Sequence, residues 1–377
     1  MPYWCLSGFY LFYFATLGVI VPYWGLYLKS VGYDAVAIGH LMALLSLTRI
    51  VAPNVWAWLA DHHEQRMRMV RLTTLLTVVA FIGVFFGSQF WWLAAVMLLF
   101  SFFWNAPLPL LEVTTMRHLG HSAGAYGRVR LWGSLGFIIS ATALGPVIDA
   151  GGPWWILPAV LALMVGIWLF AMVLPESEVP THAEHPTPFL KTILRPEVGA
   201  FLLACFLMQA SHGPYYTFYS IYLEGLGYSK TLIGALWAFA VLCEIGVFLL
   251  MPRIMARIAL RKVLMASFAL AALRWLLIGY FPENLSLLIF AQLLHAATFG
   301  MFHSAGMQIV HRFFTGRHQF RGQAIYGSLS FGGGGALGSL FSGYLWASAG
   351  PTVTFSLAAL LSLGAFVVAW RLLSDQV

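Results

Sequence analysis

The first half of this chain recurs in its second half. Four short pairs of residues, Tyr27-Leu28, Gly32-Tyr33, Ile38-Gly39 and Arg49-Ile50, return 195 positions later as Tyr222-Leu223, Gly227-Tyr228, Ile233-Gly234 and Glu244-Ile245. The residues between them are mostly apolar in both copies, and one matched position changes its charge, from Arg49 to Glu244. A chain that contains two copies of one unit predicts a fold of two related halves.

The chain is also too apolar for an ordinary water-soluble domain. Charged residues make up 9% of it and hydrophobic residues 60%, whereas soluble domains carry about 25% charged residues. A membrane-spanning helix needs about 20 apolar residues. Twelve such runs occur, at 5–28, 36–60, 70–87, 91–116, 127–149, 153–174, 197–222, 231–251, 262–280, 285–311, 322–347 and 351–371. We therefore expect an all-α membrane protein with twelve transmembrane helices in two pseudo-symmetric six-helix bundles.

One connection is long enough to separate the two bundles. It contains five prolines and mixed charges, which are typical of a linker: Pro175, Pro180, Pro186, Pro188 and Pro196. We expect an N-terminal bundle at 1–174, a linker at 175–196 and a C-terminal bundle at 197–377. The first run is too long for a cleaved signal peptide, so we interpret it as a helix.

The net charge of +7 is distributed in a way that favours a membrane over nucleic acid. With the N-terminus inside, the outer loops hold only Lys29 and Lys230. The inner loops hold Arg66, Arg68, Arg71, Arg117, Arg128, Lys191, Arg195, Arg253, Arg257, Arg261, Lys262, Arg312, Arg317 and Arg321. This positive-inside bias predicts a multi-pass protein of the cytoplasmic (inner) membrane with both termini and the linker in the cytoplasm. We expect a monomer with no nucleic-acid partner.

Four ionisable residues fall near the middle of their apolar runs. Arg49, Glu244, Arg274 and His295 each lie roughly 10 to 14 residues into a span, close to the bilayer midplane. His303 follows His295 by eight residues and lies on the same helix face. A single histidine on an apolar helix is more often a satisfied core residue. Four ionisable groups at one depth favour a shared aqueous cavity instead.

A carboxylate and a guanidinium flank the turn between spans four and five. Glu112 and Arg130 lie 18 residues apart on what should be adjacent antiparallel helices, and a pair costs less than either buried charge alone. A structural salt bridge at the lipid interface is the alternative. Pro109 and Gly127 nearby indicate a specific local geometry, which favours a functional pair.

Asp61 ends the second span and precedes a basic stretch. It could pair with a neighbouring helix end and latch one conformation, or be a solvated loop charge. His62, His63 and Glu64 follow directly, but their spacing fits no metal site, so we expect no metal. Gly333, Gly335 and Gly338 match a dinucleotide pattern inside an apolar span, where close helix packing explains them better. We expect no cofactor and no enzyme activity.

Several stretches resemble a known family. The pattern Phe12-Tyr13-Phe14, Pro22-Tyr23, Tyr27-Leu28 and Arg49-Ile50-Val51-Ala52-Pro53, ending in Trp58-Leu59-Ala60-Asp61, is similar to the signature of the phenylpropionate permease-like group. This group belongs to the major facilitator superfamily, near the lactose permease and the nucleoside–proton symporters. The resemblance covers the whole chain and implies the major facilitator fold and secondary transport.

The resemblance also implies roles for single residues. Glu112 and Arg130 look like a substrate-binding pair, Arg274 and His295 look like proton-coupling residues, and Asp61 looks like the acid of the loop motif. Two family positions differ, because Thr298 stands where a glutamate is expected and a glycine near Gly334 replaces a lysine. Glu244 would then have to carry the proton.

The charges within the spans suggest a substrate class. Three arginines, Arg49, Arg130 and Arg274, face two carboxylates, Glu112 and Glu244, so one arginine is left for a substrate carboxylate. We expect a proton-coupled symporter that takes up a small organic acid, with an aromatic acid preferred. Substrate would bind at Arg49, Glu112, Arg130 and Tyr13, and the proton at Glu244, Arg274, His295 and His303. A nucleoside or saccharide symporter is the alternative, and an exporter of lipophilic compounds is the third.

Overall fold

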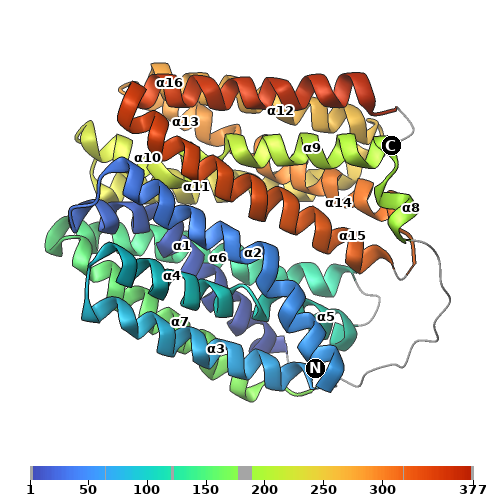
Figure 1. The fold of residues 1–377 in the computed structure, drawn as a ribbon, viewed down its shortest axis with the longest axis horizontal. Coiled ribbons are helices and arrows are strands. Elements are labelled where there is room, and N and C mark those ends of the chain that lie inside the picture. The colour runs from blue at the N-terminus through green and yellow to red at the C-terminus, as the bar shows by residue number, and fades with distance from the viewer. Residues whose placement is uncertain (1–2, 64, 120–122, 177–188, 317, 375–377) are drawn as a thin grey trace. The chain divides into compact units, whose positions relative to one another are not determined.

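The computed structural model describes residues 3–63, 65–119, 123–176, 189–316 and 318–374 (Figure 1). Every regular element in these ranges is a helix. Residue contacts group the chain into two compact units. Unit 1 comprises Met1–Tyr33, Thr48–Ala183 and Tyr228–Ala238, and unit 2 comprises Asp34–Leu47, Glu184–Gly227 and Phe239–Val377. Two long helices, α2 (Ala35–His63) and α11 (Lys230–Met255), contribute residues to both units.

The first helix is the centre of unit 1. Helix α1 (Tyr3–Ser30) is buried along most of its length, because its side chains are apolar on every face. It packs along α6 (Ala123–Gly151) and α7 (Ile156–Val173), as Figure 1 shows. The short 3₁₀ turn η2 (Pro153–Trp155) joins α6 to α7.

The remaining helices of unit 1 pack around α3. Helix α3 (Arg66–Ile82) contacts α4 (Phe90–Trp104), α5 (Pro107–Leu119) and α7, and the 3₁₀ turn η1 (Gly83–Phe86) ends it. The fourth predicted span is therefore two helices, α4 and α5. The break between them falls before Pro107, which cannot donate a backbone hydrogen bond to a continuous helix.

One long helix organises unit 2. Helices α9 (Pro196–Ser211), α10 (Gly213–Gly225) and α12 (Leu260–Tyr280) all pack along α16 (Gly335–Leu372), and Figure 1 shows α12 and α16 side by side. Helix α16 bends at Gly350, whose φ of 78° lies in the left-handed region that favours glycine.

Two spans of unit 2 contain π-helical stretches. Helix α13 (Leu285–Leu293) continues through η3 (Ala296–Met301) into α14 (Phe302–Phe313). Helix α15 (His318–Tyr326) continues through η4 (Gly327–Gly334) into α16. The short helix α8 (Phe189–Ile193) precedes α9. π-Helical turns are rare and frequently mark functional sites.

The twelve predicted runs correspond to these helices. Within the described ranges, ten helical stretches are long and apolar enough to cross a membrane, and the last of them, Arg321–Leu372, covers 52 residues. Its bend at Gly350 falls between the predicted runs 322–347 and 351–371. The predicted run 197–222 is covered by α9 and α10 together. The predicted all-α membrane fold is confirmed, while the bundle boundaries at 174 and 197 stay a prediction.

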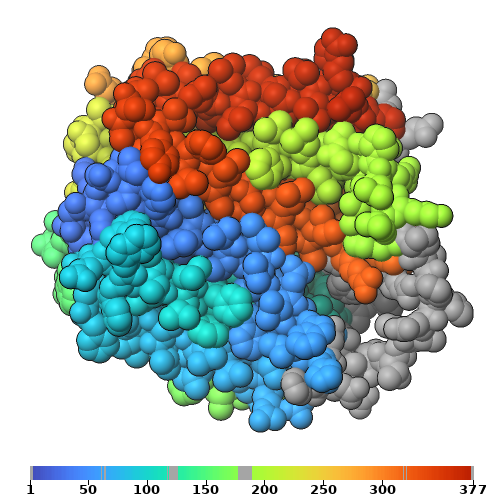
Figure 2. Space-filling view, in the orientation of Figure 1, coloured from blue at the N-terminus to red at the C-terminus, as the bar shows by residue number. Residues whose placement is uncertain are grey.

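The spans carry large apolar side chains on their outside. Val79 and Leu249 are 57% and 72% exposed, although they lie within apolar helices. Exposing such apolar side chains to water costs free energy, whereas contact with the apolar core of a bilayer does not. In the space-filling view, side chains close the gaps between neighbouring helices within each unit (Figure 2).

Candidate functional site

Unit 1 brings together the four residues that we expected to bind substrate. The Tyr13 hydroxyl on α1 interacts electrostatically with Arg49 on α2 and with Glu112 on α5. Glu112 in turn interacts with Arg130 on α6. Glu112, Arg49 and Arg130 are all half-buried. Four helices thus contribute two guanidinium groups, one carboxylate and one phenol to a single cluster, whose role stays a prediction.

Aromatic rings hold two members of this cluster in place. The Tyr13 hydroxyl donates to the carbonyl oxygen of Trp104 at 3.2 Å, and the two rings stack with centroids 5.4 Å apart. The guanidinium carbon of Arg130 lies 3.8 Å from the centroid of the Phe14 ring, a cation–π contact. Gly133 makes this contact possible, because a Cβ there would lie 2.7 Å from Arg130 Nη1 and 2.8 Å from Phe14 Cδ2.

A buried polar chain next to Arg49 was not predicted. The Asn105 side-chain amide donates to Thr48 Oγ1 at 2.8 Å, and the Thr48 hydroxyl donates to Ser101 Oγ at 3.0 Å. Asn105 occupies the break between α4 and α5. These hydrogen bonds join Thr48 on α2 to the break between α4 and α5. Because Thr48 directly precedes Arg49, they position the Arg49 backbone. The prolines at 107 and 109 are the sequence signal for this polar chain.

Unit 2 brings together the residues that we expected to carry the proton. Glu244 Oε2 on α11 lies 3.7 Å from His295 Nε2, just before η3. The His295 side chain is 7% exposed and that of Glu244 is 14% exposed. A second protonatable group thus lies within 4 Å of the Glu244 carboxylate.

Arg274 is fully buried and is surrounded by neutral groups. Its Nε donates to the Ala291 carbonyl at 2.9 Å, its Nη1 to Thr298 Oγ1 at 3.2 Å and its Nη2 to Gln292 Oε1 at 2.9 Å. The guanidinium carbon also lies 4.1 Å from the centroid of the Tyr215 ring. Thr298 stands where the resemblance led us to expect a glutamate, and its hydroxyl accepts the hydrogen bond.

His212 joins this buried cluster and was missed by the sequence reasoning. It occupies the break between α9 and α10 and has no exposed surface. Its Nδ1 lies 2.8 Å from the Met208 carbonyl, and its ring meets Trp275 edge to face at 4.8 Å. It also interacts electrostatically with Arg274. The helix-breaking Gly213-Pro214 pair that follows it is the signal that could have revealed it.

The structure gives less detail for two further predicted site residues, His303 and Asp61. His303 lies on α14, its ring parallel to that of Phe299 with centroids 6.0 Å apart. Asp61 belongs to the last turn of α2, and its side chain lies outside the described part of the structure. Among the described residues, no group of three His, Cys, Asp or Glu side chains could hold a metal ion.

A second unpredicted feature of unit 1 joins α6 to the start of α11. Asp149 Oδ1 accepts from the Lys230 backbone N–H at 2.9 Å. Asp149 Oδ2 accepts from the Thr231 N–H at 2.9 Å and from its hydroxyl at 2.6 Å. A carboxylate is well placed at a helix N-terminus, where backbone N–H groups are unpaired. Gly145 and Gly234 allow the close approach, because a Cβ at either would overlap the facing backbone.

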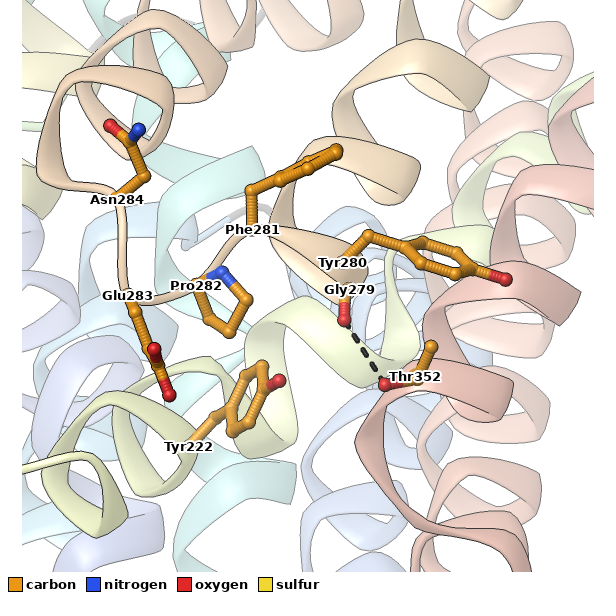
Figure 3. Close-up of a pocket in the computed structure, with 8 residues that line it drawn as sticks. All are labelled: Tyr222, Gly279, Tyr280, Phe281, Pro282, Glu283, Asn284 and Thr352. Carbon is orange, nitrogen blue, oxygen red and sulfur yellow. Dashed lines mark hydrogen bonds between the residues drawn. The ribbon is translucent and has the colours of Figure 1, made fainter.

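A pocket of about 450 Å³ lies apart from these charged clusters, at one end of unit 2. Figure 3 shows Tyr222, Pro282 and Glu283 around it, with the Thr352 hydroxyl donating to the Gly279 carbonyl at 3.2 Å. None of the predicted site residues lines it. Its position on the loop after α12 separates it from the Glu244–His295 pair within the spans.

Comparison with known proteins agrees with this architecture. The family model described as the MFS_1 like family matches residues 3–357. A "Probable 3-phenylpropionic acid transporter" of Escherichia coli (strain K12) is 28% identical over 96% of this chain and 95% of its own length. A "Maltose permease" of Geobacillus stearothermophilus is 24% identical over 94% of this chain and 91% of its own length.

The fold has solved counterparts as well. The crystal structure of the nucleoside transporter NupG superposes with a TM-score of 0.82 at 18% identity, covering 98% of this chain and 100% of NupG. At that identity the likeness speaks for the fold alone. The family match covers nearly the whole chain, and the helical architecture agrees with it. The chain therefore belongs to the MFS_1 like family and has the fold of the major facilitator transporters.

Proposed function

We propose that the protein is a proton-coupled symporter that takes up a small aromatic carboxylic acid by alternating access. The observation that carries this proposal is the charge of the unit 1 cluster. Two guanidinium groups, Arg49 and Arg130, accompany one carboxylate, Glu112, in the interior of the spans. An unbalanced buried charge is costly, and a substrate carboxylate would balance it with charge-assisted hydrogen bonds.

Arg130 is the residue we assign to the substrate carboxylate. The contact with the Phe14 ring, for which Gly133 leaves room, restrains its guanidinium, so less conformational entropy would be lost when an anion binds. A guanidinium suits a carboxylate because it can donate two parallel hydrogen bonds. Tyr13, whose hydroxyl donates to the Trp104 carbonyl, would lie beside this site.

The proton is assigned to unit 2. Glu244 and His295 are both protonatable and lie 3.7 Å apart, and both retain some exposed surface. Arg274, fixed by three hydrogen bonds, supplies a permanent positive charge to the same cluster. We assign the proton to Glu244 first and to His295 second. Protonated Glu244 would be neutral, and this change of charge would favour a different conformation of the cluster.

An aromatic acid is preferred over the other substrate classes. The Escherichia coli relative, 28% identical over almost the full length, is described as a probable transporter of 3-phenylpropionic acid. A nucleoside or saccharide is the alternative, since the solved NupG structure shares the fold and the maltose permease is 24% identical. The excess positive charge of the unit 1 cluster favours the acid, because a nucleoside or a saccharide carries no anionic group to balance that charge.

A binding screen on purified protein tests the substrate class. We expect 3-phenylpropionate to raise the melting temperature, since a ligand that binds only the folded state stabilises it. Uridine and maltose should not raise it. Arg130→Ala should abolish the shift, and Arg130→Lys should retain a weaker one. A shift by uridine or maltose, with none from aromatic acids, would contradict the proposal and favour the alternative.

A further inference from the structure

Three aromatic rings form a staircase along one span of unit 2. The rings of His295 and Phe299 are parallel within 8°, with centroids 5.5 Å apart, and those of Phe299 and His303 are parallel within 8° at 6.0 Å. These residues follow one another at intervals of four, on either side of and within η3, so they share one face of the span. Parallel rings at these separations are offset sideways, so part of each face stays uncovered.

A fourth ring stands at the side of this staircase. Phe331, in η4, meets Phe299 at 75° with centroids 6.3 Å apart and meets His303 at 75° and 5.9 Å. The four residues after Phe331 are glycines, and one of them, Gly334, packs against α9, where a Cβ would lie 2.6 Å from the Phe206 carbonyl. Phe331 is therefore the one large side chain of the segment 331–335. We call Phe299, His303 and Phe331 the aromatic corner.

The aromatic corner is accessible and adjoins the proton site. Phe299, His303 and Phe331 are each half-exposed, whereas the aromatic residues around Arg274, such as Tyr215 and Trp275, have no exposed surface. The staircase begins at His295, whose Nε2 lies 3.7 Å from the Glu244 carboxylate. Gly300 keeps this junction tight, because a Cβ there would lie 3.2 Å from Glu244 Cγ. The carboxylate of Glu244 would be costly to expose to lipid. The rings beside it therefore do not face lipid alone.

We propose that the aromatic corner receives the ring of the substrate and selects aromatic over aliphatic acids; this rests on the function proposed above. A substrate ring can stack in parallel on Phe299 while its edge meets Phe331, and both arrangements are favourable between aromatic quadrupoles. A saturated ring of the same size fills the same space. The saturated ring gains the same contact area but not the quadrupole interactions. The corner therefore binds an aromatic ring more tightly than a saturated ring of the same size.

The test compares two substrates that differ only in the ring. 3-Phenylpropionate and 3-cyclohexylpropionate have the same carboxylate and chain length, and each is measured by its half-saturation concentration for uptake into proteoliposomes. Phe299→Leu and Phe331→Leu should each raise the value for 3-phenylpropionate about twofold to tenfold. The value for 3-cyclohexylpropionate should change less than twofold. Phe299→Tyr retains a ring and should stay close to the wild-type protein.

Phe290→Leu is the matched control, because Phe290 is 44% exposed on the neighbouring helix α13 and lies outside the corner. It should change neither substrate. Equal changes for both substrates in the corner variants, or no change for either, would overturn the inference. Should Phe299→Leu fail to fold, Phe331→Leu carries the same comparison. Failure of the wild-type protein to take up any aromatic acid would contradict the proposed function itself, and this inference with it.

Discussion

Arg274 shows how a fully buried cation can be accommodated inside a membrane span. Its three nitrogens donate to a carbonyl, a hydroxyl and an amide oxygen, and two aromatic rings, those of Tyr215 and Trp275, lie beside its guanidinium. None of these groups changes its charge with pH in the physiological range. In the proposed mechanism, these contacts would therefore hold Arg274 in place while Glu244 and His295 bind and release protons.

Glu244→Gln tests the assignment of the proton at this scale. The amide mimics the neutral, protonated carboxyl, so the variant should bind substrate and exchange it across the membrane at near wild-type rates. Accumulation driven by a pH gradient should fall to background. Both are measured with labelled substrate in proteoliposomes, as counterflow and as net uptake. If Glu244→Gln still concentrates substrate, the proton takes another route, and His295→Gln is the next variant to measure.

At the scale of elements, interruptions of the helices position the sites. The break before Pro107 lies next to the polar chain behind Arg49, and the break at His212 lies beside Arg274. In the sequence repeat, Asn105 corresponds to Gly300, 195 positions later. The break between α4 and α5 thus has a counterpart in η3. Equivalent helices of the two halves are thus interrupted at equivalent sequence positions, by proline in one and by a π-helical stretch in the other.

Asp149 provides a test of how α6 holds the start of α11. Asp149→Ala removes three hydrogen bonds from Lys230 and Thr231, a loss comparable to that of an N-cap, about 1 kcal/mol. Backbone amides at 230–233 should exchange with deuterium several-fold faster. Asp34→Ala is the matched control, since Asp34 Oδ1 accepts from the Ala37 N–H at the start of α2. If the backbone amides at 230–233 exchange at the same rate in both variants and in the wild type, the Asp149 contacts do not hold the start of α11.

At the scale of the whole molecule, the distribution of arginine and lysine predicts the orientation in the membrane. Lys191, on α8 within the predicted linker, should be cytoplasmic, and Ser229, before α11, should be outside. The measurement replaces Cys5, Cys205 and Cys243 and then labels Lys191→Cys or Ser229→Cys in intact cells with an impermeant maleimide. Ser229→Cys should react and Lys191→Cys should react only after lysis. The reverse pattern would invert the topology.

The sequence predicted much of the architecture because length and polarity determine where a helix can cross lipid. The run 5–28 corresponds to α1, and the division near residue 350 falls at the positive φ of Gly350. The π-helical stretches could not be predicted, since the glycines they contain do not distinguish a π-helical turn from close helix packing. The partners of Glu244 and Arg274 depend on how separate helices are rotated. Polarity along the chain does not encode that rotation, and so the place of His212 beside Arg274 and the aromatic corner emerged only in three dimensions.

The central claim is that an aromatic acid enters together with a proton. Proteoliposomes with an alkaline interior and an acidic exterior are given labelled 3-phenylpropionate in the presence and absence of a protonophore. Passive entry of the neutral acid is subtracted with liposomes that contain the Arg130→Ala variant. We predict uptake above this background that concentrates the acid inside and collapses with the protonophore. Uptake that equals the Arg130→Ala background, or that is unchanged by the protonophore, would contradict the account.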